Sequence, residues 1–215
     1  IYGCAYWNGG VIWVIERRAG WSEMEWQLRN WNYFAWLSGD HIVEQHVHNL
    51  DVANWVIGTH PVKAVSMGGR HRRVTGDQFD FFSTDFTYPK DVHVHSQCRQ
   101  ITGCTREVSE RVVGEKGMSN CNGWISGQEL PKVKSDPYVQ EQADLIAAIR
   151  KGEPLNEAQQ VAESTLTAIM ARTSAYTGKE VTWDEMMTSD LVLGPPDYEL
   201  TEENIRAHIP VPGAA

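Results

Sequence analysis

The sequence lacks three patterns that would each assign it to a class of protein. No apolar run is long enough to cross a bilayer, and no G-x-G-x-x-G motif is present. Neither Gly9-Gly10 nor Gly68-Gly69 lies between a strand and the start of a helix, where a dinucleotide needs close backbone approach. The chain also lacks a basic stripe, and its 28 acidic and 19 basic side chains give a net charge of −9. Nucleic acid is therefore an unfavourable partner, and this chain alone should not hold a dinucleotide in the usual way.

Cysteine is scarce and carries no metal-binding spacing. The four cysteines contain no C-x-x-C pair, which argues against a structural zinc knuckle and favours free thiols: Cys4, Cys98, Cys104 and Cys121. The composition, 41% hydrophobic and 22% charged, is that of a soluble globular protein. Because the first residue is Ile1 and not Met, we expect a chain that was processed, trimmed or taken from a longer polypeptide; any export signal is then hidden, and the compartment, cytoplasm or periplasm, stays open.

Tryptophan, by contrast, is abundant near the start of the chain. Seven of the nine lie in the first 55 residues: Trp7, Trp13, Trp21, Trp26, Trp31, Trp36 and Trp55. Core and interface packing is the favoured interpretation, because Trp combines a large apolar area with a single donor. A sugar-stacking platform is the alternative, and it requires exposed rings.

Turn and capping residues predict helices at both ends of the sequence. Ser22 and Glu25 form a capping box before a helix that Gly39 ends, and Asp40 caps a second helix that ends at Gly58. Later helices are predicted at 137–150, from Asn156 and Gln159 to Gly178, and after the capping box of Thr182 and Glu185.

Short β-prone segments fill the space between these helices. Extended structure is predicted at 2–15, broken at the first glycine pair, and strands are predicted at 61–70, 79–88, 92–100, 110–117 and 121–126. Because the strands follow one another and do not alternate with helices, we predict an α+β fold: an open, mainly antiparallel sheet with helices on one face. We assign residues 1–192 to this domain and residues 193–215, with four prolines, to a C-terminal extension.

The strand at 92–100 alternates cleanly between apolar and polar residues. Its apolar side carries Val92, Val94, Ser96 and Cys98, and its polar side carries His93, His95, Gln97 and Arg99. One face of the sheet is therefore predicted to be polar along this strand.

The second helix carries the most suggestive spacing. Glu44, His48, Asp51 and Trp55 follow one another at intervals of four, three and four residues, which places them on one helical face. A carboxylate one turn from an imidazole can orient it and raise its basicity, as a general base requires. On spacing alone, an ordinary i,i+4 pair on a solvated helix is the favoured interpretation.

Several long segments resemble the Gfo/Idh/MocA oxidoreductase family. The resemblance is carried by LSGDHIVEQHVHNLDVANWVIGTHPVKAVSMGGR, by the upstream QLRNWNYFAWLSGD, by CRQITGC with SERVVGEKG, and by PLNEAQQVAESTLTAIMARTSAYTGKEVTW. Together these segments cover nearly the whole chain, and they are most similar to the branch with R-N-W and E-Q-H-V-H-N-L-D motifs.

The resemblance implies a two-part enzyme that uses NAD or NADP. Family members join an N-terminal Rossmann domain to an α+β domain whose open sheet commonly mediates oligomerisation. Their catalytic helix has a carboxylate four residues before a histidine, which implies Glu44 as the orienting group and His48 as the group that removes or returns the hydroxyl proton. This sequence has Glu where Asp is usual, and the family's catalytic lysine belongs to the absent half.

Further side chains are candidates for binding a carbohydrate. Arg29, Asn30 and Tyr33 precede the catalytic helix, with capping and packing as their alternative role. His46 lies on a different helical face from His48, and Asp51 is expected to hold the helix to its neighbours.

The polar side of the strand at 92–100 supplies the remaining candidates. His93, His95 and Arg99 could line the substrate pocket or an oligomer interface. As H-x-H, the two histidines could also bind a metal, but no third ligand is identified, so no metal is predicted.

Three functions are compatible with these residues. We favour the substrate-binding half of an NAD(P)-dependent oxidoreductase that acts on a sugar, cyclitol or glycoside, with the Rossmann domain in the same polypeptide or on a partner chain. The alternatives are a non-redox keto-sugar lyase or hydrolase that uses Glu44 and His48, and a non-catalytic domain that binds carbohydrate or scaffolds an assembly. Bound metal, bound NAD and turnover are the observations that separate them.

Overall fold

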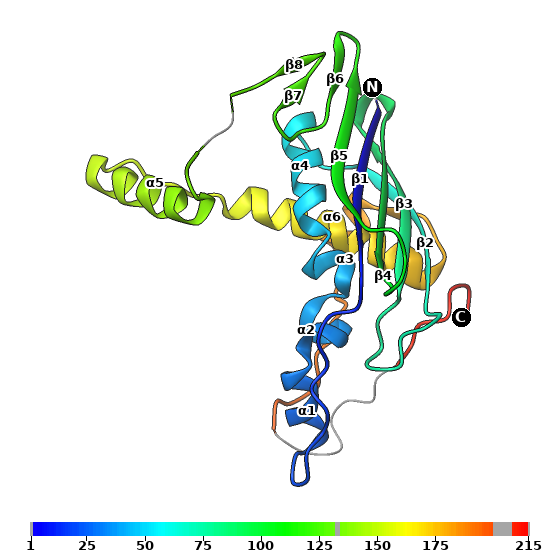
Figure 1. Cartoon of the computed structure of the whole chain (residues 1–215). Helices are drawn as coiled ribbons and strands as arrows, with labels where there is room; N and C mark the ends of the chain where they lie inside the picture. Colours follow the sequence, from blue (N-terminus) through cyan, green and yellow to red (C-terminus); the bar gives the residue numbers. More distant parts are fainter. Residues whose placement is uncertain (1, 132–133, 200–207, 215) are drawn as a thin grey trace.

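A single large sheet organises the molecule. The computed structural model describes residues 2–131, 134–199 and 208–214. In this part of the chain nine strands form one sheet, in the order β8-β7-β6-β5-β1-β4-β3-β2-β9 (Figure 1). The strands are β1 (Tyr2–Gly9), β2 (Lys63–Gly69), β3 (Phe81–Tyr88), β4 (Val92–Gln100), β5 (Glu107–Gly114), β6 (Gly117–Ser119), β7 (Trp124–Ile125), β8 (Gln128–Glu129) and β9 (Val181–Thr182).

All neighbouring strands run antiparallel except one pair. β1 lies between β4 and β5, parallel to β4 and antiparallel to β5. Ala5 therefore has Ser96 of β4 on one side and Glu110 of β5 on the other. Ser96, Ala5 and Glu110 thus form one row across three neighbouring strands.

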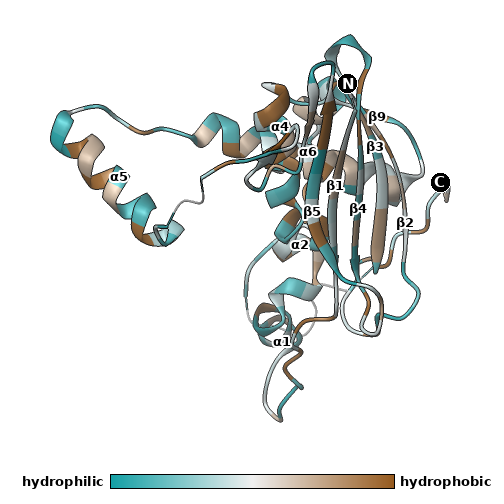
Figure 2. Ribbon diagram, turned by 45° about the horizontal axis from the view of Figure 1, so that its top comes forward, coloured by the Kyte–Doolittle hydropathy of each residue, from teal (hydrophilic) through white to brown (hydrophobic). Residues whose placement is uncertain are grey.

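The helices gather on one side of the sheet, and α5 extends away from it (Figures 1 and 2). They are α1 (Glu23–Arg29), η1 (Trp31–Tyr33), α2 (Ala35–Ser38), α3 (His41–Glu44), α4 (Val47–Ile57), η2 (Pro89–Asp91), α5 (Pro137–Lys151), α6 (Ala158–Thr177) and α7 (Trp183–Met187). α6 packs against β2, and α4 packs against α6, β1 and β5. The predicted α+β class, with an open, mainly antiparallel sheet and helices on one face, is confirmed.

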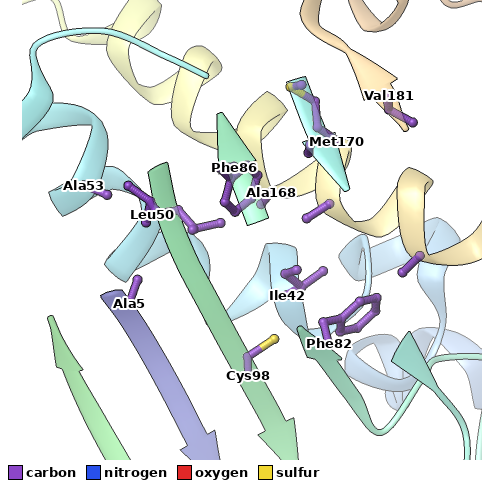
Figure 3. Close-up of a cluster of buried hydrophobic side chains, with 14 of the residues drawn as sticks. Ala5, Ile42, Leu50, Ala53, Phe82, Phe86, Cys98, Ala168, Met170 and Val181 are labelled. Atoms are coloured by element: carbon purple, nitrogen blue, oxygen red, sulfur yellow. The ribbon is translucent and has the colours of Figure 1, made fainter. Parts of the chain in front are cut away.

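The hydrophobic core lies between the sheet and these helices. Ala5, Phe82 and Phe86 from the strands meet Leu50 of α4 and Met170 of α6 (Figure 3). Each of these side chains is at most 2% exposed. Burying one large apolar side chain of this kind contributes roughly 1.5–3 kcal/mol, so this layer holds α4 and α6 firmly on the sheet.

The predicted alternation of β4 is confirmed by the burial of its residues. Val92, Val94, Ser96 and Cys98 are buried, whereas His93, His95, Gln97 and Arg99 are half-exposed. The second set lies on the face that the helices of the described chain leave open, together with Val65 and Met67 of β2, which are 48% and 72% exposed.

Both predicted N-terminal helices are interrupted. The predicted helix from residue 23 to 37 breaks at Asn30, whose side-chain amide donates to the carbonyls of Ile15 and Trp26 and accepts from the amide of Ile15. A side chain that satisfies the backbone in this way competes with the helical hydrogen bonds. The predicted helix from residue 41 to 57 breaks at Gln45 and His46, so α3 and α4 are separate helices.

Other features of the sequence are found as predicted or close to it. Thr182 and Glu185 form the reciprocal capping box of α7, and Glu25 donates its amide to Ser22. The four cysteines are free thiols. The strand predicted at 110–117 is shifted to 107–114.

The C-terminal segment contacts the rest of the domain. Gly213 donates its amide to the carbonyl of Thr177 at 3.1 Å, and the ring of Tyr198 lies 6.2 Å from that of Trp36. The boundary at residue 193 remains a prediction. Among the described helices, none has the length and apolar character required to span a bilayer.

Candidate active site around His48

His48 lies in the first turn of α4 and points its ring towards β1. The imidazole is exposed, and its centroid is 6.0 Å from the ring of Trp7, with 36° between the planes. Trp7 is half-buried and packs partly against the core, so this pair lies at the edge of the helix-covered face. An exposed imidazole beside a flat apolar surface can exchange a proton with a ligand that packs on that surface.

The tryptophans lie at the margin of the core or on the surface. None of the nine falls in the buried class, and Trp13, Trp31 and Trp55 are 50%, 41% and 74% exposed. The favoured packing role therefore holds only in part: Trp7 and Trp183 contact the core cluster at its margin.

Glu44 is separated from His48 by the break between the two helices. One carboxylate oxygen, Oε1, accepts from the side chain of Gln45, and the other, Oε2, is enclosed without a hydrogen-bond partner. Within the described residues, no hydrogen bond joins Glu44 to His48. The regular i,i+4 geometry assumed from the sequence is therefore not present, and the orienting role of Glu44 remains a prediction.

Behind His48, four side chains form a continuous hydrogen-bonded chain. Ser96 Oγ lies 2.6 Å from His46 Nε2, His46 Nδ1 lies 3.3 Å from Asn49 Oδ1, and Asn49 Nδ2 donates to Glu110. His46, Asn49 and Ser96 are at most 2% exposed. Burial lowers the pKa of His46 to about 3, so its imidazole is neutral.

The prediction that His46 lies on a different helical face from His48 is confirmed, because His46 is buried and His48 is exposed. His46 lies on the same buried side as Leu50 and Ala53, and its contact with Ser96 of β4 is a long-range one that helical spacing alone could not identify. Asp51 behaves as expected: its carboxylate accepts from Ser164 at 2.6 Å and ties α4 to α6.

The three candidates upstream of α3 form no hydrogen bond or ring contact with His48 in the part of the chain that the structure describes. Asn30 and Tyr33 are at most 1% exposed, and the hydroxyl of Tyr33 donates to the carbonyl of Ile12 at 2.8 Å. Arg29 is exposed, pairs with Glu25 at 2.9 Å and lies 4.3 Å from the ring of Trp21. The polar atoms of Asn30 and Tyr33 are thus engaged in capping and packing, the alternative that the sequence left open.

The candidates on β4 lie on the opposite face of the sheet from His48. His93 contacts Asp85 at 2.9 Å and Asp91 at 3.3 Å, and these carboxylates raise the pKa of His93. His95 contacts the side chain of Gln97, and Arg99 donates to the carbonyl of Thr105. Because the sheet separates the two groups, His93, His95 and Arg99 cannot line one pocket with His48 in a single chain.

A pocket of about 720 Å³ lies beside the C-terminal end of α4. Its walls are mostly apolar and include Trp55, Val112, Met118, Trp124, Ile125 and Leu130. This volume falls in the range of small-molecule sites.

The described residues form no binding site for a metal ion or for a dinucleotide. No cluster of three or more His, Cys, Asp or Glu side chains in this part of the chain is arranged to hold a metal. The mainly antiparallel sheet also offers no strand followed by a glycine turn and a helix N-terminus, the arrangement that a dinucleotide pyrophosphate requires.

Comparison with known protein families identifies the class of this domain. A sequence profile described as the GFO/IDH/MocA C-terminal domain matches residues 10–120, which are 111 of the 215 residues. The chain belongs to the Gfo/Idh/MocA oxidoreductase family, and it has the fold of the family's C-terminal domain. A search among curated proteins found no match.

Solved structures share this fold at low sequence identity. The WlbA dehydrogenase from Bordetella pertussis, in complex with NADH and UDP-GlcNAcA, is 14% identical with a TM-score of 0.60, over 84% of this chain and 53% of that chain. The myo-inositol 2-dehydrogenase from Lactobacillus plantarum is 16% identical with a TM-score of 0.59, over 85% and 56%. The aldose-aldose oxidoreductase from Caulobacter crescentus is 15% identical with a TM-score of 0.59, over 84% and 55%. This chain therefore spans about half the length of the structures it matches.

Proposed function

We propose that this chain is the substrate-binding half of an NAD(P)-dependent oxidoreductase that acts on a hydroxyl or ketone of a sugar, cyclitol or glycoside. His48 is the general acid and base that exchanges the proton of the reacting hydroxyl. The observation that carries the proposal is the exposed imidazole of His48 beside Trp7, at the position where the family has its catalytic histidine. Family membership and the dehydrogenases among the matched structures support the reaction class.

Trp7 and His48 have complementary roles in this proposal. The apolar C–H face of a cyclitol or pyranose packs on the ring of Trp7, and the hydroxyl at its edge then faces the imidazole. A histidine is suited to this exchange because its ordinary pKa lies near neutrality. Glu44, with one unpartnered carboxylate oxygen, is the group we assign to support the imidazole when substrate is bound.

The nicotinamide cofactor requires a second structural unit. Because the described residues do not fit a dinucleotide, we place NAD or NADP on a Rossmann domain, in the same polypeptide or on a partner chain. An intact mass of the protein from its source, compared with the 24.3 kDa of this chain, distinguishes the two arrangements. In either case, the residues of this chain supply substrate binding and proton exchange.

Replacing His48 tests the catalytic assignment. We expect His48→Ala in the complete protein to lower kcat by roughly 10²–10⁴-fold with an accepted polyol substrate and NAD or NADP. His71→Ala is the matched control, because His71 is exposed and bonds Asp80 only through its backbone amide. Full turnover by the His48→Ala enzyme would refute the role of His48.

A further inference from the structure

The first turn of α4 is not held by a continuous helix. His46 donates its amide back to His41, five residues earlier, at 3.2 Å. The amides of His48 and Asn49 bond only three residues back, to Gln45 and His46, at 3.4 and 3.1 Å. The N-cap of α4, His46, makes no side-chain capping bond. The backbone that carries His48 therefore needs other contacts to fix its position.

The hydrogen-bond network of Ser96, His46, Asn49 and Glu110 supplies those contacts. Ser96 and Glu110 flank Ala5 in the row that crosses β4, β1 and β5. His46 and Asn49 thus fasten the start of α4 to the strands on both sides of β1. Trp7 follows Ala5 by two residues on β1, so it lies on the same face of the strand. His48, between the two fastened residues in sequence, is held beside Trp7.

The direction of every hydrogen bond in the Ser96–His46–Asn49–Glu110 network follows from the carboxylate of Glu110. An ionised Glu110 can only accept, so the amide nitrogen of Asn49 must face it. The amide oxygen of Asn49 then accepts from His46 Nδ1–H, and His46 Nε2, which carries no proton, accepts from the hydroxyl of Ser96. A reversed Asn49 amide would place its oxygen against the carboxylate. One orientation of the whole chain is therefore favoured, and burial keeps His46 neutral within it.

We propose that His46 and Asn49, anchored by Ser96 and Glu110, are positioning residues that hold the imidazole of His48 beside Trp7 for reaction. This proposal rests on the proposed function, because it assigns the network a purpose at that same site. If the network had a purely structural role, removing the hydrogen-bond acceptor at residue 110 would leave His48 in place. The proposal predicts that His48 moves.

Two variants of Glu110 isolate that requirement in the complete protein. Glu110→Gln keeps an acceptor oxygen for Asn49, whereas Glu110→Leu has a similar size and removes the acceptor. We expect Glu110→Leu to lower kcat by roughly 10–100-fold with little change in KM, because a displacement of about 1 Å can cost 10²-fold in rate. Glu110→Gln should stay within about threefold of the wild type.

The position of His48 can be measured without any turnover. In protein labelled with ¹³C at histidine Cε1, the His48 signal is identified by its loss in His48→Gln, and its ring-current shift is defined by Trp7→Leu. Glu110→Leu should move the His48 signal towards its position in Trp7→Leu, and Glu110→Gln should leave it in place. If Glu110→Leu fails to fold, Ser96→Ala takes its place, because it removes the donor at the other end.

The outcomes separate this proposal from the proposed function. An unmoved His48 signal in the acceptor-free variant would overturn positioning, as would an equal loss of kcat in Glu110→Gln and Glu110→Leu. Full turnover by His48→Ala would instead refute the catalytic function, while the NMR shifts would still decide whether the network places His48.

Discussion

Lowering the pH should destabilise this domain through one buried side chain. His46 is fully buried, and its pKa of about 3 lies well below the value of about 6.5 in an unfolded chain. Below pH 6.5 the unfolded state therefore binds a proton that the folded state does not bind. The contribution of His46 to stability is retained above pH 6.5 and is lost progressively as the pH falls from 6.5 towards 3.

The size of the effect at pH 5 depends little on the folded pKa, because pH 5 is still well above 3. The pH is then 1.5 units below the unfolded pKa of about 6.5, and each unit lowers the free energy of unfolding by about 1.4 kcal/mol. The free energy of unfolding at pH 5 is therefore about 2 kcal/mol lower than at pH 7.5. His93 acts in the opposite direction: its pKa is raised by Asp85 and Asp91, so it favours the folded state as the pH falls. A titration of the wild type alone would therefore mix the two contributions.

A comparison of variants separates these contributions. Urea unfolding of wild type and His46→Gln, followed by far-UV circular dichroism at pH 7.5, 6.5, 5.5 and 5, gives the pH dependence of each. The difference between their free energies of unfolding should shrink by about 2 kcal/mol from pH 7.5 to 5. His93→Gln is the matched control, and it should steepen the loss at low pH. Parallel pH profiles for wild type and His46→Gln would refute the burial of a neutral imidazole.

Three further substitutions test other parts of the fold. Tyr88→Phe removes the hydroxyl that donates to the buried Asn54 at 2.7 Å, and it should lower the free energy of unfolding by about 1–3 kcal/mol in urea titrations. Thr182→Ala removes the capping box of α7 and should cost about 1 kcal/mol in the same assay; no change would mean that α7 does not depend on its cap. Met67→Asp places a charge on the open face of the sheet, and if that face joins copies of the chain, light scattering should show a smaller assembly with unchanged circular dichroism.

The sequence predicted the sheet well because its signals are local. The alternation of β4 depends only on the two-residue period of a strand, and the capping box of α7 depends on two side chains three residues apart. Both appear as predicted. The class of fold followed from the order of such segments, which requires no knowledge of long-range contacts.

The candidate site was harder to predict because it depends on tertiary contacts. Asn30 breaks the first helix through bonds to Ile15, and the break at Gln45 and His46 accompanies bonds from α4 to two strands. A helical wheel assumes that such breaks are absent, so it placed Glu44 beside His48 on one face, and it could not show which strand residues His46 contacts. Periodicity also could not reveal that His93 and His48 lie on opposite faces of the sheet.

The position of β1 has a consequence for how the chain folds. The residues with which β1 pairs on β4 and β5 lie about 90 to 110 positions later in the sequence. This strand therefore joins two strand groups that have no other direct pairing among the described residues. Pairing at such separation is slow, because a long loop must close before the contacts form. Until β5 is available, β1 has an unpaired edge beside a nascent sheet of β2, β3 and β4, and such an edge can pair with other chains. We therefore expect assembly of the central strands to limit the rate of folding, and β1 to be the segment through which partly folded chains aggregate.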